Sequence, residues 1–309
     1  MAACAEGPEF HIVDVFAERA YQGNPLAVVL GDEGLDRAAM QAIAAEINYS
    51  ETAFAARTAQ PDGSWRVRLF TPAREIDFAG HPILGAAVVI RDRLAGPGPV
   101  LLDLPVGQVP VTFEPGTAGG ELAWFRAPDV TLGATCAHER MAHALGLGPA
   151  DIEERAPVRM AGAGTAAMIV PLRKLAALER ARLDLDAYAP LAADGFPTLV
   201  YLFCAETHAP NNDVCARFFF EAHGVREDPA TGNGAAFLGA YLLEHRLLGN
   251  GALDLRIEQG HAVRRPSLVR LRARPAARGR EIDVGGNVIT TVRGHLVPGP
   301  AAFSCETDQ

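Results

Sequence analysis

The chain has 309 residues, 49% of them hydrophobic and 21% charged, and its formal net charge at pH 7 is −9. This composition predicts a globular protein of two domains, and the negative charge disfavours nucleic acid and membrane surfaces as partners. The start resembles no signal peptide, no run of about 18 apolar residues occurs, and the five cysteines are odd in number. We therefore expect a cytoplasmic protein without a disulfide framework.

Strand patterns dominate the first part of the chain. Apolar and β-branched runs predict strands over residues 10–16, 26–30, 49–55, 65–71, 100–104 and 109–113. Helical spacing of apolar residues predicts an amphipathic helix over 35–48 that lies on a sheet. A further helix, expected over 80–96, is apolar nearly all round, so a sheet curled around it is the simplest enclosure.

The second part begins after the Gly-rich segment PGTAGG (115–120), which we interpret as the domain boundary. A second enclosed helix is expected over 232–249, ending on glycine. Strands are predicted over 121–126, 166–172, 198–204, 213–220, 253–259, 267–273 and 287–292. The expected fold is therefore α+β, with two pseudo-symmetric lobes, 1–118 and 119–286, each a β-barrel-like sheet wrapped around a central helix.

The two enclosed helices belong to an imperfect internal repeat. Segments 68–87 and 217–240 share the order aromatic strand, acidic residue, Asp, Gly-rich turn and buried helix. Repeated lobes often face each other across a ligand-binding cleft. Gly80 and Gly232, with Asn233 beside the second, would let an anion approach unpaired N–H groups at the helix starts. We therefore expect a small anionic metabolite as substrate.

Three titratable side chains lie in or near these turns. Glu51 is the single carboxylate in the run INYSETAFAA (47–56), and desolvation beside such a site would raise its pKa and suit it to proton transfer at carbon. His81 and Asp228, at the two helix starts, can orient or assist. Each also has a structural interpretation, with His81 or Asp228 as a helix cap and Glu51 on the exposed face of an edge strand.

Five segments resemble the PhzF-like phenazine biosynthesis family, which is related in fold to diaminopimelate epimerase. They are VDVFAERAYQGNPLAVVL (13–30), NYSETAFA (48–55), RLFTPAREIDFAGHPILGAA (68–87), REDPATGNGAAFLGAYL (226–242) and EQGHAVRRPSLVRL (258–271). The resemblance covers nearly the whole chain. It implies two lobes, a homodimer, no cofactor, and a possible return of residues 287–309 to the first lobe.

The resemblance also implies residue roles. In the characterised isomerase of phenazine biosynthesis, a glutamate of the S-E-T motif moves a proton between carbons of a dihydro-hydroxyanthranilate, and Glu51 corresponds to it. His81 corresponds to the histidine of G-H-P, and Asp228 to the aspartate of D-P-[AV]-T-G. The implied substrate-binding residues are Asn24, Gly80, Gly232 and Asn233.

Two departures from the family pattern leave the substrate open. Asn233 and Gly234 stand where many members have Ser-Ala, and Arg264 precedes Arg265 where glycine is common. One alternative is an epimerase or racemase of an amino or hydroxy acid, although the two-thiol form of that chemistry would need cysteines at the helix starts. The other is a non-catalytic protein that binds a small ligand.

Two further motif matches predict no site. GAGTAA (162–167) fits a dinucleotide-binding pattern, but a strand-like segment follows it instead of a helix. HERMAH (138–143) spaces its histidines five residues apart, off one helical face. We therefore expect neither a dinucleotide nor a metal site.

Overall fold

The computed structural model describes residues 7–116, 120–220 and 227–297, and the chain divides into two compact units. The first unit comprises Met1–Tyr21, Pro25–Phe125 and Asn287–Gln309, and the second comprises Gln22–Asn24 and Arg126–Gly286. The change of unit after Phe125 lies slightly beyond PGTAGG, where the sequence places a boundary near residue 118. Residues 117–119 of that segment lie outside the described part of the chain.

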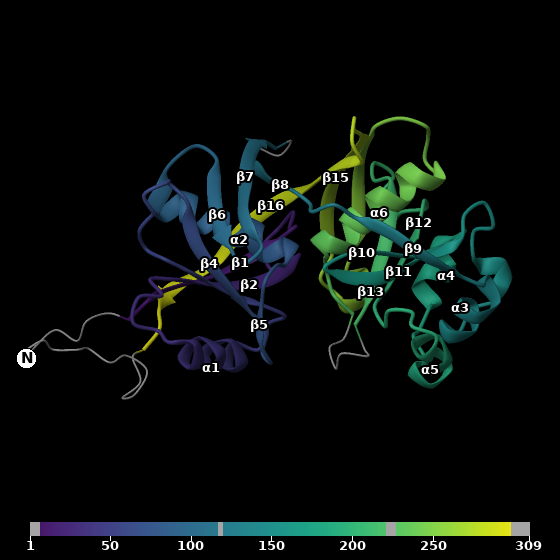
Figure 1. Ribbon diagram of the computed structural model, residues 1–309, viewed down its shortest axis with the longest axis horizontal. Helices are drawn as coiled ribbons and strands as arrows, with labels where there is room; N and C mark the ends of the chain where they lie inside the picture. The colour runs from purple at the N-terminus through teal and green to yellow at the C-terminus, as the bar shows by residue number, and fades with distance from the viewer. Residues whose placement is uncertain (1–6, 117–119, 221–226, 298–309) are drawn as a thin grey trace, which may run out of the picture. The chain divides into compact units, whose positions relative to one another are not determined.

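The first unit is a closed β-barrel, drawn from purple to blue in Figure 1 with β16 in yellow. Neighbouring strands are hydrogen-bonded in the order β1 (Glu9–Val15), β2 (Asn24–Leu30), β3 (Thr52–Ala55), β4 (Trp65–Phe70), β6 (Val100–Leu104), β7 (Gly107–Pro115), β8 (Glu121–Arg126) and β16 (Arg280–His295). Antiparallel pairing of β1 with β16 closes the ring. The short β5 (Glu75–Ile76) pairs with β4 beside it.

Helix α2 (Gly80–Ile90) packs inside this barrel. Its residues are buried on almost every side, and it contacts β1, β3, β6 and β7. Gly85 permits this close approach, because a Cβ there would lie 2.4 Å from Cδ2 of Leu26 on β2. The helix continues through a π-helical turn, Arg91–Ala95, and stops at Gly96. The enclosed helix predicted over 80–96 is confirmed.

Helix α1 (Arg37–Ile47) packs on β3 and β4. The side chain of Asp36 caps its start by accepting a hydrogen bond from the Ala39 N–H at 2.8 Å. Asn48 ends it in the left-handed conformation, with φ of 56°. The amphipathic helix predicted over 35–48 is also confirmed.

The second unit is a sheet that wraps around α6 (Gly232–His245). Its strands neighbour one another in the order β9 (Thr131–Cys136), β10 (Val158–Ala163), β11 (Thr165–Pro171), β12 (Val200–Cys204), β13 (Val214–Phe219), β14 (Leu253–Gln259), β15 (Ser267–Pro275) and the first part of β16. The first strand of this series, β9, and the strand next to its other end, β15, both contact α6. The same helix is therefore approached from several sides, as Figure 1 shows for this unit.

Helix α6 is shorter than the sequence predicts. It ends at His245, and Arg246 adopts the left-handed conformation with φ of 56°, so the predicted stop on glycine near residue 249 is wrong. Gly234 allows the first turn to approach β12, because a Cβ there would lie 2.6 Å from the ring of Tyr201. Small residues thus let both enclosed helices pack close to their strands.

Short helices cover the other face of the second sheet. These are α3 (His138–Ala144), α4 (Leu175–Arg180) and α5 (Leu185–Ala193), and a hydrophobic cluster that includes Tyr188, Leu202 and Phe219 lies beneath them. The sequence analysis did not predict α3, α5, β5, β9 or β10. Throughout the described ranges, every helix is too short or too polar to cross a membrane.

Candidate active site

The first unit brings Glu51 and His81 together. The strand begins at Thr52, so the prediction of a strand over 49–55 is wrong at its start and Glu51 lies just before β3. His81 is the second residue of α2. Its Nε2 lies 3.4 Å from Oε2 of Glu51, and the two side chains are 6% and 17% exposed. The Glu51 carboxyl is therefore held in a largely buried place with a polar neighbour.

His81 is neutral at physiological pH. Burial lowers the pKa of its imidazole from 6.5 to about 3, because charging the ring away from water is costly. A neutral imidazole has one donor and one acceptor nitrogen. His81 can thus hydrogen-bond Glu51 either as carboxylate or as carboxylic acid, without adding a positive charge.

The second unit holds Asp228 in a polar network. Oδ1 accepts a hydrogen bond from Nδ2 of Asn24 at 2.8 Å, and Oδ2 accepts one from the hydroxyl of Thr231. The Asn24 amide also donates to the backbone oxygen of Ala230 at 2.8 Å. Asn24 is fully buried, so its described contacts fix the loop that carries Asp228.

Gln259, at the end of β14, completes this network. Its Nε2 donates to the backbone oxygen of Asp228 at 2.9 Å and to Oγ1 of Thr231 at 3.1 Å, and its Oε1 accepts from the Thr231 N–H. The sequence analysis assigned no role to Thr231 or Gln259. Both lie inside the quoted family segments, which is the signal that could have identified them.

Burial makes Asp228 an unusual carboxyl group. Desolvation, the largest effect, raises its pKa from 3.8 to about 7, and the hydrogen bonds from Thr231 and Asn24 offset only part of the rise. The negative charge of the adjacent Glu227 adds to it. Near neutral pH, Asp228 is therefore present in both its acid and its carboxylate form.

A buried ion pair anchors the residue before Asp228. The Glu227 carboxylate accepts hydrogen bonds from Arg217, including Nη2 to Oε2 at 2.7 Å, and the side chains of Arg217 and Glu227 are 9% and 6% exposed. Nη1 of the same arginine donates to the backbone oxygens of Leu178 and Ala181. The Asp228 N–H in turn donates to the Phe218 oxygen at 3.0 Å, so the backbone on either side of Asp228 is fixed.

The predicted anion-binding residues lie at the two helix starts. Gly80 opens α2 and Gly232 opens α6, and neither helix has a side-chain hydrogen bond at its N-cap. Asn233 is the second residue of α6 and is half-buried. The first-turn N–H groups of each helix can therefore bind a carboxylate. Glu51, His81 and Gly80 belong to the first unit, and Asn24, Asp228, Gly232 and Asn233 to the second.

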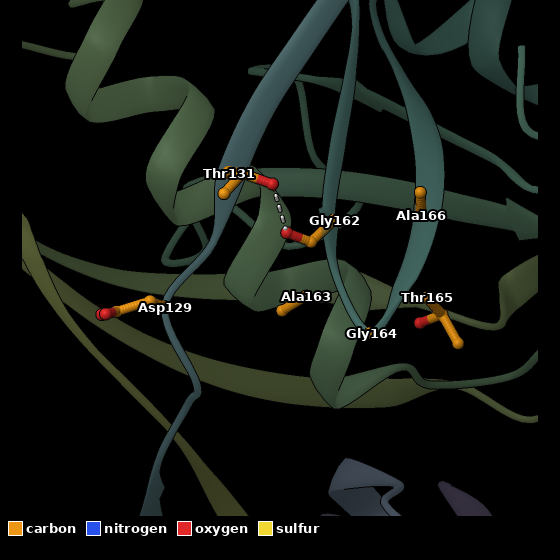
Figure 2. A pocket seen from close by; sticks show the side chains of 7 residues that line it. All are labelled: Asp129, Thr131, Gly162, Ala163, Gly164, Thr165 and Ala166. Atoms are coloured by element: carbon orange, nitrogen blue, oxygen red, sulfur yellow. Dashed lines mark hydrogen bonds between the residues drawn. The ribbon is translucent and has the colours of Figure 1, made fainter.

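The two other motif matches lie in a hairpin turn and on a short helix. GAGTAA forms the turn between the antiparallel strands β10 and β11, with Gly164 at φ of 76°, and no helix follows it. Figure 2 shows a surface hollow beside this turn, where Thr131 donates a hydrogen bond to the Gly162 oxygen at 3.2 Å. HERMAH lies on α3, and the metal-type cluster found among the described residues does not include its histidines.

Comparison with known proteins identifies the family of this chain. The family model described as phenazine biosynthesis-like protein matches residues 13–294. An uncharacterized isomerase of Mesorhizobium japonicum is 34% identical over 296 residues, 93% of this chain and 95% of that protein. The trans-2,3-dihydro-3-hydroxyanthranilate isomerase of Pseudomonas aeruginosa is 33% identical over 282 residues, 89% of this chain and 94% of that protein.

The fold is also similar to solved structures of this family. A solved structure of a phenazine biosynthesis protein of the PhzF family from Bacillus anthracis superposes with a TM-score of 0.87, at 23% identity, over 95% of this chain and all of that one. The two-unit α+β fold predicted from the sequence is therefore confirmed. Because the family match and the relatives extend over nearly its whole length, the chain belongs to the PhzF-like phenazine biosynthesis family.

Proposed function

We propose that this protein is an isomerase that moves a proton between carbon atoms of a small, cyclic carboxylate without a cofactor. The observation that carries the proposal is the pairing of Glu51 with a neutral, buried His81 at 3.4 Å. In this pair Glu51 is the group that exchanges a proton with the substrate, because burial lowers the pKa of His81 to about 3. The relative from Pseudomonas aeruginosa is named for trans-2,3-dihydro-3-hydroxyanthranilate, which sets the substrate class.

Glu51 acts first as base and then as acid. As carboxylate it removes a proton from a C–H bond, and the electron pair of that bond forms a new double bond while the existing double bond shifts. As carboxylic acid it returns the proton to the carbon at the far end. No atom or electron is gained or lost. His81 is a positioning residue that hydrogen-bonds Glu51 in both states.

Within the second unit, Asp228 and the first turn of α6 can bind a carboxylate. The acid form of Asp228, which a pKa of about 7 makes available, donates a hydrogen bond and avoids repulsion of an anion. The N–H groups of Gly232 and Asn233 add dipolar attraction, and those beside Gly80 offer the same at α2. Asn24 acts on the substrate through Asp228, to which its amide is bonded.

Solvent exchange tests this reaction. The protein is incubated in deuterated water with trans-2,3-dihydro-3-hydroxyanthranilate and with a panel of cyclic amino and hydroxy acids, and products are followed by NMR. We expect double-bond migration with deuterium incorporation. Glu51→Gln should lower the rate by about 10² to 10⁴, the usual contribution of a general acid–base. Glu46→Gln, an exposed position on α1, is the matched control and should keep the wild-type rate.

The other functions considered give different results. Deuterium incorporation with inversion at a stereocentre and no migration would identify an epimerase or racemase. Saturable binding without exchange, equal in wild type and Glu51→Gln, would identify a binding protein. Exchange that persists at the wild-type rate in Glu51→Gln would contradict the role given to Glu51.

Two accompanying proposals concern assembly and location. The resemblance supports a homodimer, which light scattering on the purified protein would test. The free and buried state of Cys136, Cys204 and Cys215 supports a reducing, cytoplasmic location, which fractionation of the source cells would test.

A further inference from the structure

A cluster of potential metal ligands in the second unit takes no part in the proposed reaction. His208, Cys215 and Glu258 each offer a ligand atom, and these atoms all lie within 4.8 Å of one another. His261 lies beside them, with Nε2 3.6 Å from Oε2 of Glu258 and its ring centroid 4.0 Å from that of His208. The cluster thus contains two imidazoles, a thiol and a carboxylate from three segments, since Glu258 and His261 are three residues apart.

The Glu258 carboxylate is already held in place. Its Oε1 accepts hydrogen bonds from the Ala209 N–H at 2.8 Å and from Nδ2 of Asn212 at 2.6 Å, and Oε2 accepts one from the His208 N–H at 2.8 Å. Each carboxylate oxygen can accept two hydrogen bonds, so Oε2 keeps a lone pair for another partner. Such outer hydrogen bonds orient ligands in natural metal sites.

The remaining groups suit a soft divalent cation. Cys215 is 3% exposed, and its sulfur lies within 4.8 Å of the ligand atoms of His208 and Glu258. Thiolate sulfur and imidazole nitrogen are ligands that Zn²⁺ prefers in proteins.

We propose that His208, Cys215, Glu258 and His261 form a zinc-binding site. Four ligands of mixed nitrogen, sulfur and oxygen type are characteristic of tetrahedral Zn²⁺. Bond lengths of about 2.0 to 2.3 Å place the ligand atoms roughly 3.3 to 3.8 Å apart in a tetrahedron. The ligand atoms of His208, Cys215 and Glu258, which lie within 4.8 Å of one another, must therefore approach by up to about 1 Å. The His208 and His261 side chains, 31% and 38% exposed, can rotate inward without repacking the core.

The zinc site lies on the opposite face of β14 from the Asp228 network. Glu258 and Gln259 are consecutive on this strand, so their side chains point to opposite faces. Gln259 bonds Thr231 and the backbone of Asp228, whereas Glu258 bonds the loop of His208. Zinc would therefore stabilise the fold without touching the substrate, and its presence can be tested independently of the isomerase activity.

Metal binding is tested on the full chain without an affinity tag. Cys4 and Cys305 are changed to serine in the parent protein, so that these thiols cannot contribute. After treatment with a chelator, Zn²⁺ is added, excess metal is removed by desalting, and bound zinc is measured by mass spectrometry. We expect one zinc per chain, an upward shift of the melting temperature, and a thiolate-to-metal absorption band when Co²⁺ replaces Zn²⁺.

Three variants test whether zinc binding depends on the proposed ligands or only on the stability of the fold. Cys215→Ala and His261→Ala should each weaken zinc binding at least tenfold, and Cys215→Ala should also remove the Co²⁺ thiolate band. His261 is exposed, so its variant should fold even if Cys215→Ala does not. Cys136→Ala, which removes another buried free cysteine of the same core cluster, is the matched control. The proposal would be overturned if the parent protein retained no zinc. It would also be overturned if Cys136→Ala lost as much zinc binding as Cys215→Ala and His261→Ala.

Discussion

Replacing Asp228 with asparagine should change how the stability of the protein depends on pH. Desolvation raises the pKa of this carboxyl from 3.8 to about 7, so the folded protein keeps a proton that the unfolded chain releases above about pH 4. The unfolded state binds fewer protons in this window, so stability falls as pH rises from about 4 to about 7 and is constant above it. Asparagine has nearly the same shape as aspartate, and its Oδ1 can still accept the hydrogen bond from Asn24. Its side chain does not titrate.

The size of the effect follows from the two pKa values. Each pKa unit corresponds to about 1.4 kcal/mol, so the rise to about 7 costs the folded state about 4 kcal/mol at pH 8 and almost nothing near pH 4. The free energy of unfolding of Asp228→Asn, relative to wild type, should therefore increase by up to about 4 kcal/mol across this range. Other titrating groups are common to both proteins and cancel in the difference.

Urea denaturation at several pH values between 4 and 8 measures this difference. Asp254→Asn, at a side chain that is 74% exposed on β14, is the control and should show little pH-dependent change. A difference between Asp228→Asn and wild type that stays constant within about 1 kcal/mol would refute the reasoning. It would mean that Asp228 titrates in the folded protein much as it does in the unfolded chain.

Two further substitutions test the local structure. Arg264 has φ of 59°, a conformation that glycine adopts without strain, so Arg264→Gly should raise the free energy of unfolding by about 1 kcal/mol. Chemical denaturation measures this change. If Arg264→Ala raises the free energy of unfolding by the same amount, loss of the side chain and not relief of backbone strain is responsible. Glu227→Gln should cost about 3 to 5 kcal/mol because it leaves the Arg217 guanidinium buried without its counter-ion. The double change Arg217→Met/Glu227→Leu should cost clearly less, and an equal loss would contradict this explanation.

Local patterns in the sequence were sufficient to predict the enclosed helices and most strands. A helix that is apolar on every side has to be surrounded, whatever surrounds it, so 80–96 and 232–249 could be assigned without coordinates. The family segments likewise singled out Glu51, His81 and Asp228. The helix end at His245 was missed because Arg246 adopts a conformation that usually belongs to glycine.

The sequence pattern was not sufficient to predict the short helices of the second unit. The seven-residue α3 offers too few turns for an apolar stripe to stand out, and α5 contains Pro190, which argues against a helix. Their stability comes from packing on the hydrophobic cluster of the second unit, which is assembled from distant strands. Propensity alone does not contain that information.

The chemical state of the candidate site depends on contacts far apart in the chain. Sequence alone identified Asp228 as a carboxyl at a helix start, but its pKa is set by burial and by Asn24, 204 residues away in sequence. His81 is neutral for the same reason, since only folding removes water from its ring. The His208, Cys215, Glu258 and His261 cluster likewise exists only once β12, β13 and β14 are paired. The sequence by itself determined which groups are present and which helices are enclosed, whereas the tertiary structure decided their protonation, because desolvation and long-range hydrogen bonds arise only when distant segments meet.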